Sequence, residues 1–187
     1  MHICLVWGLK KVKSESRLYI RKVNSDILIV SLYIDDLLVT GSNQCLMVKF
    51  KAEMEEVFEM TYLGDMSYFL GMEVHQNQHE IFIYKQKHAK EILKKFKMEE
   101  CKPTTTPMNQ KEKFCKEDGA EKVNEELYRN MVGCLMYLTA TRPDIVHVVS
   151  LLSRYMHCAS EIHLQAVKHI VRYIKGTIDF GIKFKQV

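Results

Sequence analysis

The run DILIVSLYIDDLLVTG, residues 26–41, places two adjacent aspartates in the middle of an apolar stretch rich in β-branched residues. This composition predicts two strands, 26–33 and 37–40, joined by a tight turn. Both strand faces are apolar, which favours a hairpin buried on both sides. A carboxylate in apolar surroundings is costly unless it is paired, hydrogen-bonded or bound to a metal. Asp35 and Asp36 therefore mark either an exposed turn or a metal site.

Composition indicates a globular chain with either one sizeable core or two small subdomains. Of 187 residues, 47% are hydrophobic and 27% are charged, values that exclude a globally disordered chain. The formal net charge of +4 is unevenly distributed, with basic groups in 10–22, 85–102 and 168–185 and an acidic one in 53–65. Such alternation suits phosphate contact at several points, but solvated helix faces have the same pattern.

The six cysteines include no Cys-x-x-Cys pair, so neither a disulfide framework nor a zinc knuckle is predicted. His157, Cys158 and His163 match no familiar metal-binding spacing and are interpreted as structural. The sequence shows no signal peptide and no apolar run long enough to span a bilayer. We expect an intracellular protein, cytoplasmic or nuclear, without membrane contact.

Hydrophobic periodicity predicts a mixed α+β fold before a polar segment and mainly helices after it. Ser42 is predicted to cap a helix over 42–59. A strand over 68–74 is expected to pair with one over 80–84, and Gly71 suggests a bulge or a close backbone approach. The further elements expected are a strand at 18–20, a basic amphipathic helix at 86–97, a helix through 127–138, one capped by Thr141 with Pro143 in its first turn, and one from Ser160 to Gly176.

Several motifs, in order, resemble the polymerase region of copia-type retrotransposon Pol polyproteins. The similarity begins near Leu18 and extends to the C-terminus. Its centre is Tyr33-Ile-Asp-Asp36, the Y-x-D-D signature of reverse transcriptases. The other motifs are FEMTYLGDMSYFLGMEV (58–74), QKHAKEILKKFKMEECKPTTTPM (86–108), LYRNMVGCLMYLTATRPDI (127–145) and HLQAVKHIVRYIKGT (163–177).

The resemblance implies roles for individual residues. Asp35 and Asp36 would be the catalytic ligands for Mg²⁺ or Mn²⁺, bound weakly if at all by the isolated chain, and Tyr33 would lie near the primer end and incoming nucleotide. A primer-grip-like hairpin would comprise Phe69, Leu70, Gly71 and Met72. The thumb-like helix would contact nucleic acid through Lys87, Lys90, Lys94 and Lys95.

The resemblance also implies a division of the chain. We expect a divergent segment at 1–17, a partial polymerase palm with both hairpins at 18–84, and a thumb-like basic helix at 85–101. A linker at 102–119 and a helical connection-like region at 120–187 would follow. The partners implied are an RNA template, a DNA primer, and the fingers-palm and ribonuclease H segments of a longer polyprotein.

One departure from the family bears on activity. The D-x-K-x-A-F-L type motif that supplies a third catalytic aspartate does not occur in this sequence. We therefore expect a reverse transcriptase fragment, truncated at its N-terminus and inactive alone, unless Asp26 or Asp65 replaces the third ligand. The alternatives are a non-catalytic, salt-sensitive nucleic-acid-binding remnant and a transposon relic without function.

Overall fold

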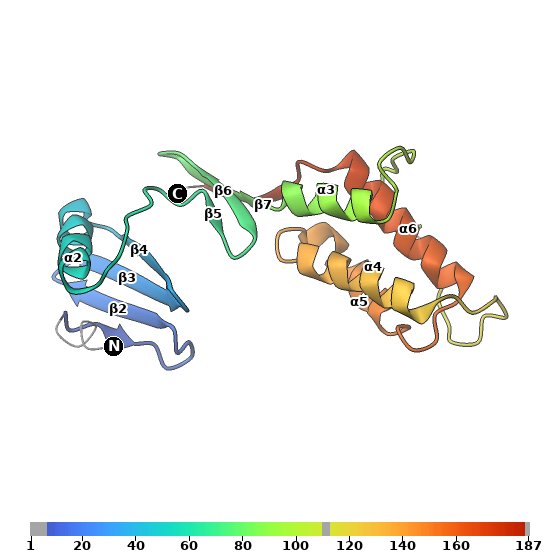
Figure 1. Ribbon diagram of the computed structural model, residues 1–187, viewed down its shortest axis with the longest axis horizontal. Coiled ribbons are helices and arrows are strands. Elements are labelled where there is room, and N and C mark those ends of the chain that lie inside the picture. The colour runs from blue at the N-terminus through green and yellow to red at the C-terminus, as the bar shows by residue number, and fades with distance from the viewer. Residues whose placement is uncertain (1–6, 110–112, 186–187) are drawn as a thin grey trace. The chain divides into compact units, whose positions relative to one another are not determined.

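The computed structural model describes residues 7–109 and 113–185, and the chain forms two compact units, Met1–Gly64 and Asp65–Val187 (Figure 1). Each unit contains an antiparallel four-stranded sheet. The predicted mixed α+β class is confirmed at this level. None of the helices within the described ranges is long and apolar enough to cross a membrane.

The sheet of the first unit has the strand order β1-β2-β3-β4. Its strands are β1 (Lys10–Lys11), β2 (Leu18–Val23), β3 (Asp26–Tyr33) and β4 (Asp36–Gly41). Alternate residues of β3 point to one face, where Leu28 and Val30 are fully buried. On the other face Ile29 and Leu38 keep intermediate exposure, so the hairpin is not buried on both sides as expected.

Helix α2 (Gln44–Val57) covers the buried face of this sheet. Phe50 and Met54 pack with the β3 residues, as the predicted spacing of apolar residues requires. The predicted cap is wrong by one residue. Asn43, not Ser42, caps α2, and its side chain accepts from the Leu46 N–H at 3.2 Å. The Ser42 hydroxyl instead accepts from the Ile27 N–H at 2.9 Å, which ties the end of β4 to β3.

The second unit begins with two tight hairpins. Strand β5 (Tyr68–Phe69) turns at Leu70–Gly71 into β6 (Met72–Gln76), which pairs with β7 (Glu80–Tyr84). The single strand expected over 68–74 is therefore two short strands. Gly71, with φ 76°, occupies a turn rather than a bulge. Both turn residues have positive φ, the geometry of a type I′ turn, whose twist suits an antiparallel hairpin.

Four helices form the main core of the second unit: α3 (Gln86–Lys95), α4 (Glu125–Leu138), α5 (Pro143–Ser153) and α6 (Glu161–Gly176). Ser160 caps α6 as expected, in a reciprocal arrangement with the His163 side chain. Pro143 begins α5, also as expected, but Thr141 is not its cap. Thr141 is fully buried, and its hydroxyl donates to the Leu138 carbonyl at 3.4 Å.

Strand β8 (Gly181–Lys185) was absent from the sequence prediction, which expected helices in this part of the chain. It pairs antiparallel with β7 and gives the second sheet the order β5-β6-β7-β8. The segment predicted as a linker lies along α6 in its described part. Arg172 Nε donates to the Lys102 carbonyl at 2.8 Å, and the His169 ring contacts the Thr106 carbonyl at 2.9 Å.

Candidate catalytic and nucleic-acid-binding sites

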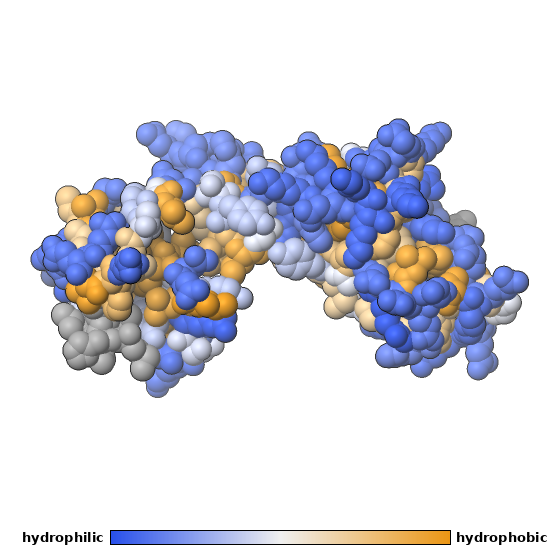
Figure 2. Space-filling view, viewed as in Figure 1, coloured by the Kyte–Doolittle hydropathy of each residue, from blue (hydrophilic) through white to orange (hydrophobic). Residues whose placement is uncertain are grey.

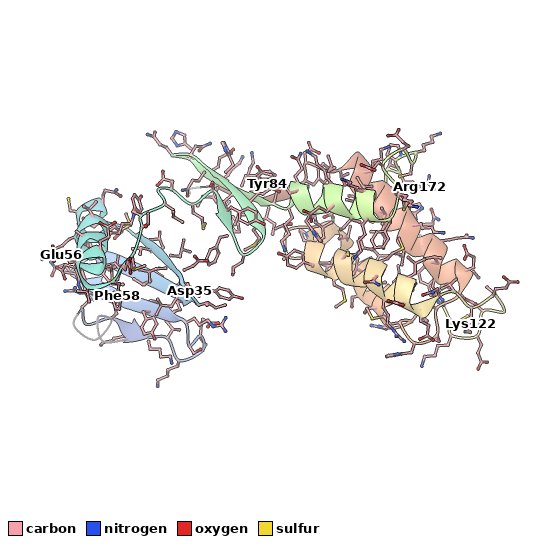
Figure 3. The ribbon with its side chains drawn as sticks, in the orientation of Figure 1. Asp35, Glu56, Phe58, Tyr84, Lys122 and Arg172 are labelled. Carbon is pink, nitrogen blue, oxygen red and sulfur yellow. The ribbon has the colours of Figure 1, made fainter. Side chains whose placement is uncertain are left out.

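The two aspartates lie at the tip of the β3–β4 hairpin, where Tyr33 pairs with Asp36 across a two-residue turn of Ile34 and Asp35. Figure 3 labels Asp35 at this tip. The expected turn is thus one residue shorter, because Asp36 already belongs to β4. Both aspartates are exposed, so water can solvate their charges, and the energetic problem of burying adjacent carboxylates does not arise. The tip presents hard oxygen donors directly to solvent.

The backbone at this tip is strained. Ile34 has φ 52° and is 83% exposed. A positive φ at only the first central residue is typical of a type II′ turn, where glycine is preferred. A β-branched residue in this region is a genuine outlier, with a cost of about 1–3 kcal/mol. The sheet holds this conformation through the regular pairing of Leu32 with Leu37 and of Tyr33 with Asp36.

Tyr33 lies on the same strand face as Asp36, because directly paired residues project to one side of a sheet. The guanidinium of Arg17 lies 5.0 Å from the centre of the Tyr33 ring. This contact places a cation beside the carboxylate tip and leaves Tyr33 only partly exposed. The predicted nucleotide-binding tyrosine and the two predicted metal ligands are therefore brought together.

No third metal ligand lies beside them in the described part of the chain. Across residues 7–109 and 113–185, no three histidine, cysteine, aspartate or glutamate side chains gather into a potential metal site. Asp26 begins β3, seven residues from its end, and is thus about 23 Å from the tip at the usual strand rise. Its carboxylate accepts from the Asn43 amide at 2.7 Å. Asp26 is excluded as the third ligand, and Asp65 belongs to the second compact unit.

The β5–β6 turn, predicted to contact primer, is held by the side chain of Tyr137 from α4. The Tyr137 hydroxyl donates to the Leu70 carbonyl at 3.2 Å. A Cβ added to Gly71 would lie 1.7 Å from the same hydroxyl oxygen, so only glycine fits here. The close approach that the sequence indicated at Gly71 is therefore made within the chain. Phe69 and Met72 pair on either side of the turn.

The ammonium of Lys85 contacts both the carbonyl and the ring of Tyr137. It is only 4% exposed, and its ammonium donates to the Tyr137 carbonyl at 2.9 Å while lying 3.2 Å from the ring centre. Burial lowers the pKa of Lys85. The sequence counted Lys85 only among the basic residues and gave no sign of its burial. Its burial involves Tyr137, 52 residues further along the chain, so no local pattern indicates it.

The lysines of α3 divide into two sets. Lys87, Lys90 and Lys94 follow helical spacing on the exposed side, opposite the buried Ala89, Ile92 and Leu93. Figure 2 shows hydrophilic side chains over this helix. Lys95 differs, because its ammonium lies 3.7 Å from Cys134 Sγ on α4. The expected basic helix thus offers three lysines on one face.

The model of the family described as "Reverse transcriptase (RNA-dependent DNA polymerase)" matches residues 3–110. The chain belongs to this family. The match includes the carboxylate tip, the β5–β6 turn and α3, and the resemblance to copia-type retrotransposon Pol polyproteins is confirmed.

The curated relatives include three Pol polyproteins. The chain is 32% identical over 182 residues to the Retrovirus-related Pol polyprotein from transposon RE1 of Arabidopsis thaliana, a match covering 97% of this chain and 12% of the relative. It is 32% identical over 177 residues to that from transposon TNT 1-94 of Nicotiana tabacum, covering 89% of this chain and 13% of the relative. The chain therefore spans about an eighth of their length.

An uncharacterized mitochondrial protein of Arabidopsis thaliana is 35% identical over 151 residues, covering 81% of this chain and 62% of that protein. No solved structure matches the chain.

Proposed function

We propose that this chain supplies the catalytic carboxylate tip of a retrotransposon reverse transcriptase, with Asp35 and Asp36 as ligands for divalent cations in RNA-directed DNA synthesis. The observation that carries the proposal is the exposed, strained two-residue turn that presents both carboxylates in a chain of this family. Strained turns are kept where the surrounding structure enforces them, and they concentrate at functional sites.

The donor set fits Mg²⁺ or Mn²⁺ in kind, although two carboxylates alone make an open site. Magnesium prefers hard oxygen ligands and takes the remainder from substrate phosphates and water. When bound, such ions activate a 3′-hydroxyl and stabilise a leaving pyrophosphate. Asp35 and Asp36 supply charge at the tip, with Asp35 the more direct ligand. We expect the isolated chain to bind Mg²⁺ only at roughly millimolar concentration, as an open site with few ligands should.

The remaining predicted residues have supporting roles in this proposal. The ring of Tyr33, on the face of Asp36, would contact the nucleotide or the primer end. The β5–β6 turn at Phe69, Leu70, Gly71 and Met72 would contact the primer, with Leu70 41% exposed. Lys87, Lys90 and Lys94 would bind backbone phosphates of a template–primer duplex, with Lys95 beside them, a contact that weakens with salt. Binding through these lysines alone is the non-catalytic alternative.

Primer extension tests the proposal. We expect no extension by the purified 187-residue chain on an RNA template, because the part of the chain that the structure describes joins no third carboxylate to the tip. Adding the fingers and first palm segment of a retrotransposon Pol polyprotein, by fusion or in trans, should give measurable extension. Asp35→Asn in the fusion should abolish it.

Two variants serve as controls in the fusion. Asp179→Asn removes an exposed aspartate near β8 and should leave the rate unchanged. Asp65→Asn tests the remaining alternative for a third ligand. Robust extension by the chain alone, or a fully active Asp35→Asn fusion, would refute the assignment.

A further inference from the structure

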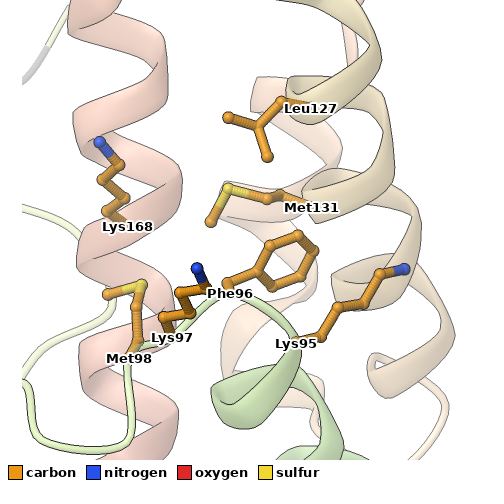
Figure 4. Close-up of a pocket in the computed structure, with 7 residues that line it drawn as sticks. All are labelled: Lys95, Phe96, Lys97, Met98, Leu127, Met131 and Lys168. Carbon is orange, nitrogen blue, oxygen red and sulfur yellow. The ribbon is translucent and has the colours of Figure 1, made fainter.

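A pocket of about 290 Å³ lies where the C-terminal end of α3 meets α4 and α6 (Figure 4). It is formed entirely within the second unit. None of the described residues that line it is acidic. The lining consists of three lysines, Lys95, Lys97 and Lys168, and four apolar residues, Phe96, Met98, Leu127 and Met131.

The backbone at Lys97 has a conformation that usually requires glycine. The Met98 N–H donates to the Leu93 carbonyl at 2.8 Å, and the Lys97 N–H donates to the Lys94 carbonyl at 3.1 Å. These two bonds form a Schellman motif, in which the residue at the position of Lys97 is usually glycine. Lys97 has φ 55°, a conformation that costs a non-glycine residue about 1 kcal/mol or more. The chain therefore carries a lysine where helix termination favours glycine.

The cationic groups are placed for an anionic ligand. Lys97 comes from the α3 terminus and Lys168 from α6, and Figure 4 shows both side chains beside the pocket, across from Leu127 and Met131. Lys168 is exposed and Met131 is only 2% exposed, so the charges stand over an apolar floor. Lys95 also lines the pocket, and its ammonium lies 3.7 Å from Cys134 Sγ and 5.5 Å from the centre of the Phe96 ring.

The same pocket offers an aromatic surface. Phe96 is half-buried and lines the pocket beside Met131. Single-stranded nucleic acid is bound by this combination, in which lysines follow the backbone and bases stack on aromatic side chains. The volume of about 290 Å³ is slightly below the roughly 300 Å³ at which ligand pockets begin, so it suits one base rather than a duplex.

We propose that this pocket binds one unpaired nucleotide of a single-stranded nucleic acid, with its base against Phe96 and Met131 and its flanking phosphates on Lys97 and Lys168. This site goes beyond the proposed function. It uses neither the carboxylate tip nor the exposed lysine face of α3, and it needs no metal ion.

Fluorescence anisotropy with the full chain tests the proposal, with a short labelled oligodeoxyadenylate as the probe. We expect Lys97→Gly and Lys168→Gln together to weaken binding about tenfold and to reduce the slope of log affinity against log salt by about 1.4, at about 0.7 per phosphate contact. Lys97→Gly should preserve or raise the melting temperature, because glycine suits the helix end. A loss of binding in the single variant Lys97→Gly then cannot be attributed to misfolding.

A second comparison isolates the base. An abasic strand of the same length keeps the phosphates and should bind about tenfold more weakly than the intact strand, given the usual contribution of one stacked base. Phe96→Leu should remove most of that difference. Lys49→Ala, which removes an exposed lysine from α2, is the matched charge control and should change binding little.

Three outcomes would overturn the proposal: equal affinity for intact and abasic strands, losses in the pocket variants no larger than that of Lys49→Ala, or equally tight and equally sensitive binding of a duplex. The catalytic assignment is tested separately, by primer extension with the fusion, so failure here and failure of that assignment are distinguishable.

Discussion

Two pairs of charged residues lie in otherwise apolar segments: Asp35 with Asp36, and Arg142 with Asp144. The first pair is exposed to solvent, whereas Arg142 of the second pair is buried. The first pair lies at a strained hairpin tip. In the second, Arg142 is 2% exposed and its guanidinium donates to both carboxylate oxygens of Asp144, at 2.9 Å to Oδ1 and at 2.7 Å to Oδ2. A charge pair completed within the chain supports the fold, whereas charges presented to solvent remain available to a ligand.

Arg142 also joins the start of α5 to the end of α6. It donates to the Thr177 carbonyl at 2.9 Å and to the Thr177 hydroxyl at 2.7 Å, and it lies over the rings of Tyr173 and Phe180. Burial alone would raise the pKa of Asp144, but the hydrogen bonds and charge of Arg142 outweigh it, and the pKa is lowered. Every polar atom of this guanidinium has a partner.

The largest effect should separate these two pairs. We expect Arg142→Ala to reduce the free energy of unfolding by about 3–5 kcal/mol, because it leaves a partly buried carboxylate without its cation. Arg154→Ala, at an exposed arginine following α5, and Asp35→Asn should each stay within about 0.5 kcal/mol. Urea denaturation followed by circular dichroism measures all three. A small loss of stability in Arg142→Ala would contradict the claim that this buried charge pair supports the fold.

The next effect concerns the β5–β6 turn. Gly71→Ala should cost about 1–3 kcal/mol, since it adds a Cβ in a positive-φ conformation and collides with the Tyr137 hydroxyl. Tyr137→Phe removes that hydroxyl, so the cost of Gly71→Ala should be smaller in its background. A double-mutant cycle by denaturation gives this coupling. Strict additivity would mean that the contact does not constrain the turn.

A pH effect should also come from the second unit. His163 is fully buried beside Ser160 and Tyr155, its Nδ1 lies 3.7 Å from Asp118, and its Nε2 has no hydrogen-bond partner among the described residues. Burial lowers the pKa of His163, although Asp118 opposes this and Lys122 adds to it. The folded state thus favours neutral His163, and stability present above about pH 6.5 should fall as the pH drops below it.

The slope of the free energy of unfolding against pH can reach at most about 1.4 kcal/mol per pH unit for one titrating group. His163→Gln should flatten it between pH 6.5 and 5, whereas His79→Gln, in an exposed turn, should not. Below this range Asp118 contributes too, because the Ser160 hydroxyl and the Ala120 N–H lower its pKa, so its stabilisation is lost as pH falls through and below about 3.8. Thermal melts across this range, at constant ionic strength, distinguish the two groups.

The smallest effect should be a gain of stability from a substitution at the β3–β4 hairpin tip. Ile34→Gly relieves a positive φ at a β-branched residue and should raise the free energy of unfolding by about 1 kcal/mol, the strain exceeding the entropy cost of glycine. Denaturation of the chain measures the gain, and primer extension by the fusion shows whether the strained residue serves the active tip. Loss of stability in Ile34→Gly would contradict the strain assigned here.

The sequence predicted the first hairpin well because the β-branched run and its acidic turn carry the pattern locally. The turn was placed one residue too long, since an isoleucine at positive φ gives no local sign of itself. Gly71 was recognised as a close approach, but its partner, Tyr137, lies far along the chain and could not be read from spacing. The burial of Arg142 and of Lys85 likewise depends on residues distant in sequence.

The candidate site residues also divide into those that a local motif indicates and those that depend on residues distant in sequence. Asp35 and Asp36 were found because a short motif carries them. Lys97 and Lys168 were not singled out, since they converge only when α3 and α6 pack. One clue existed in Lys97, two residues after the last residue of α3, where glycine would be the ordinary choice.

Strand β8 sets the order in which the second unit can be completed on the ribosome. Its pairing with β7 joins Tyr84 to Gly181 and Glu80 to Lys185, about a hundred residues later. Such distant pairing closes a long loop and is intrinsically slow. During synthesis, β7 therefore remains an open edge until α3, α4, α5 and α6 have all emerged, and an open edge can pair with another chain. The time between these two strands is the period in which a nascent chain is most exposed to misassembly.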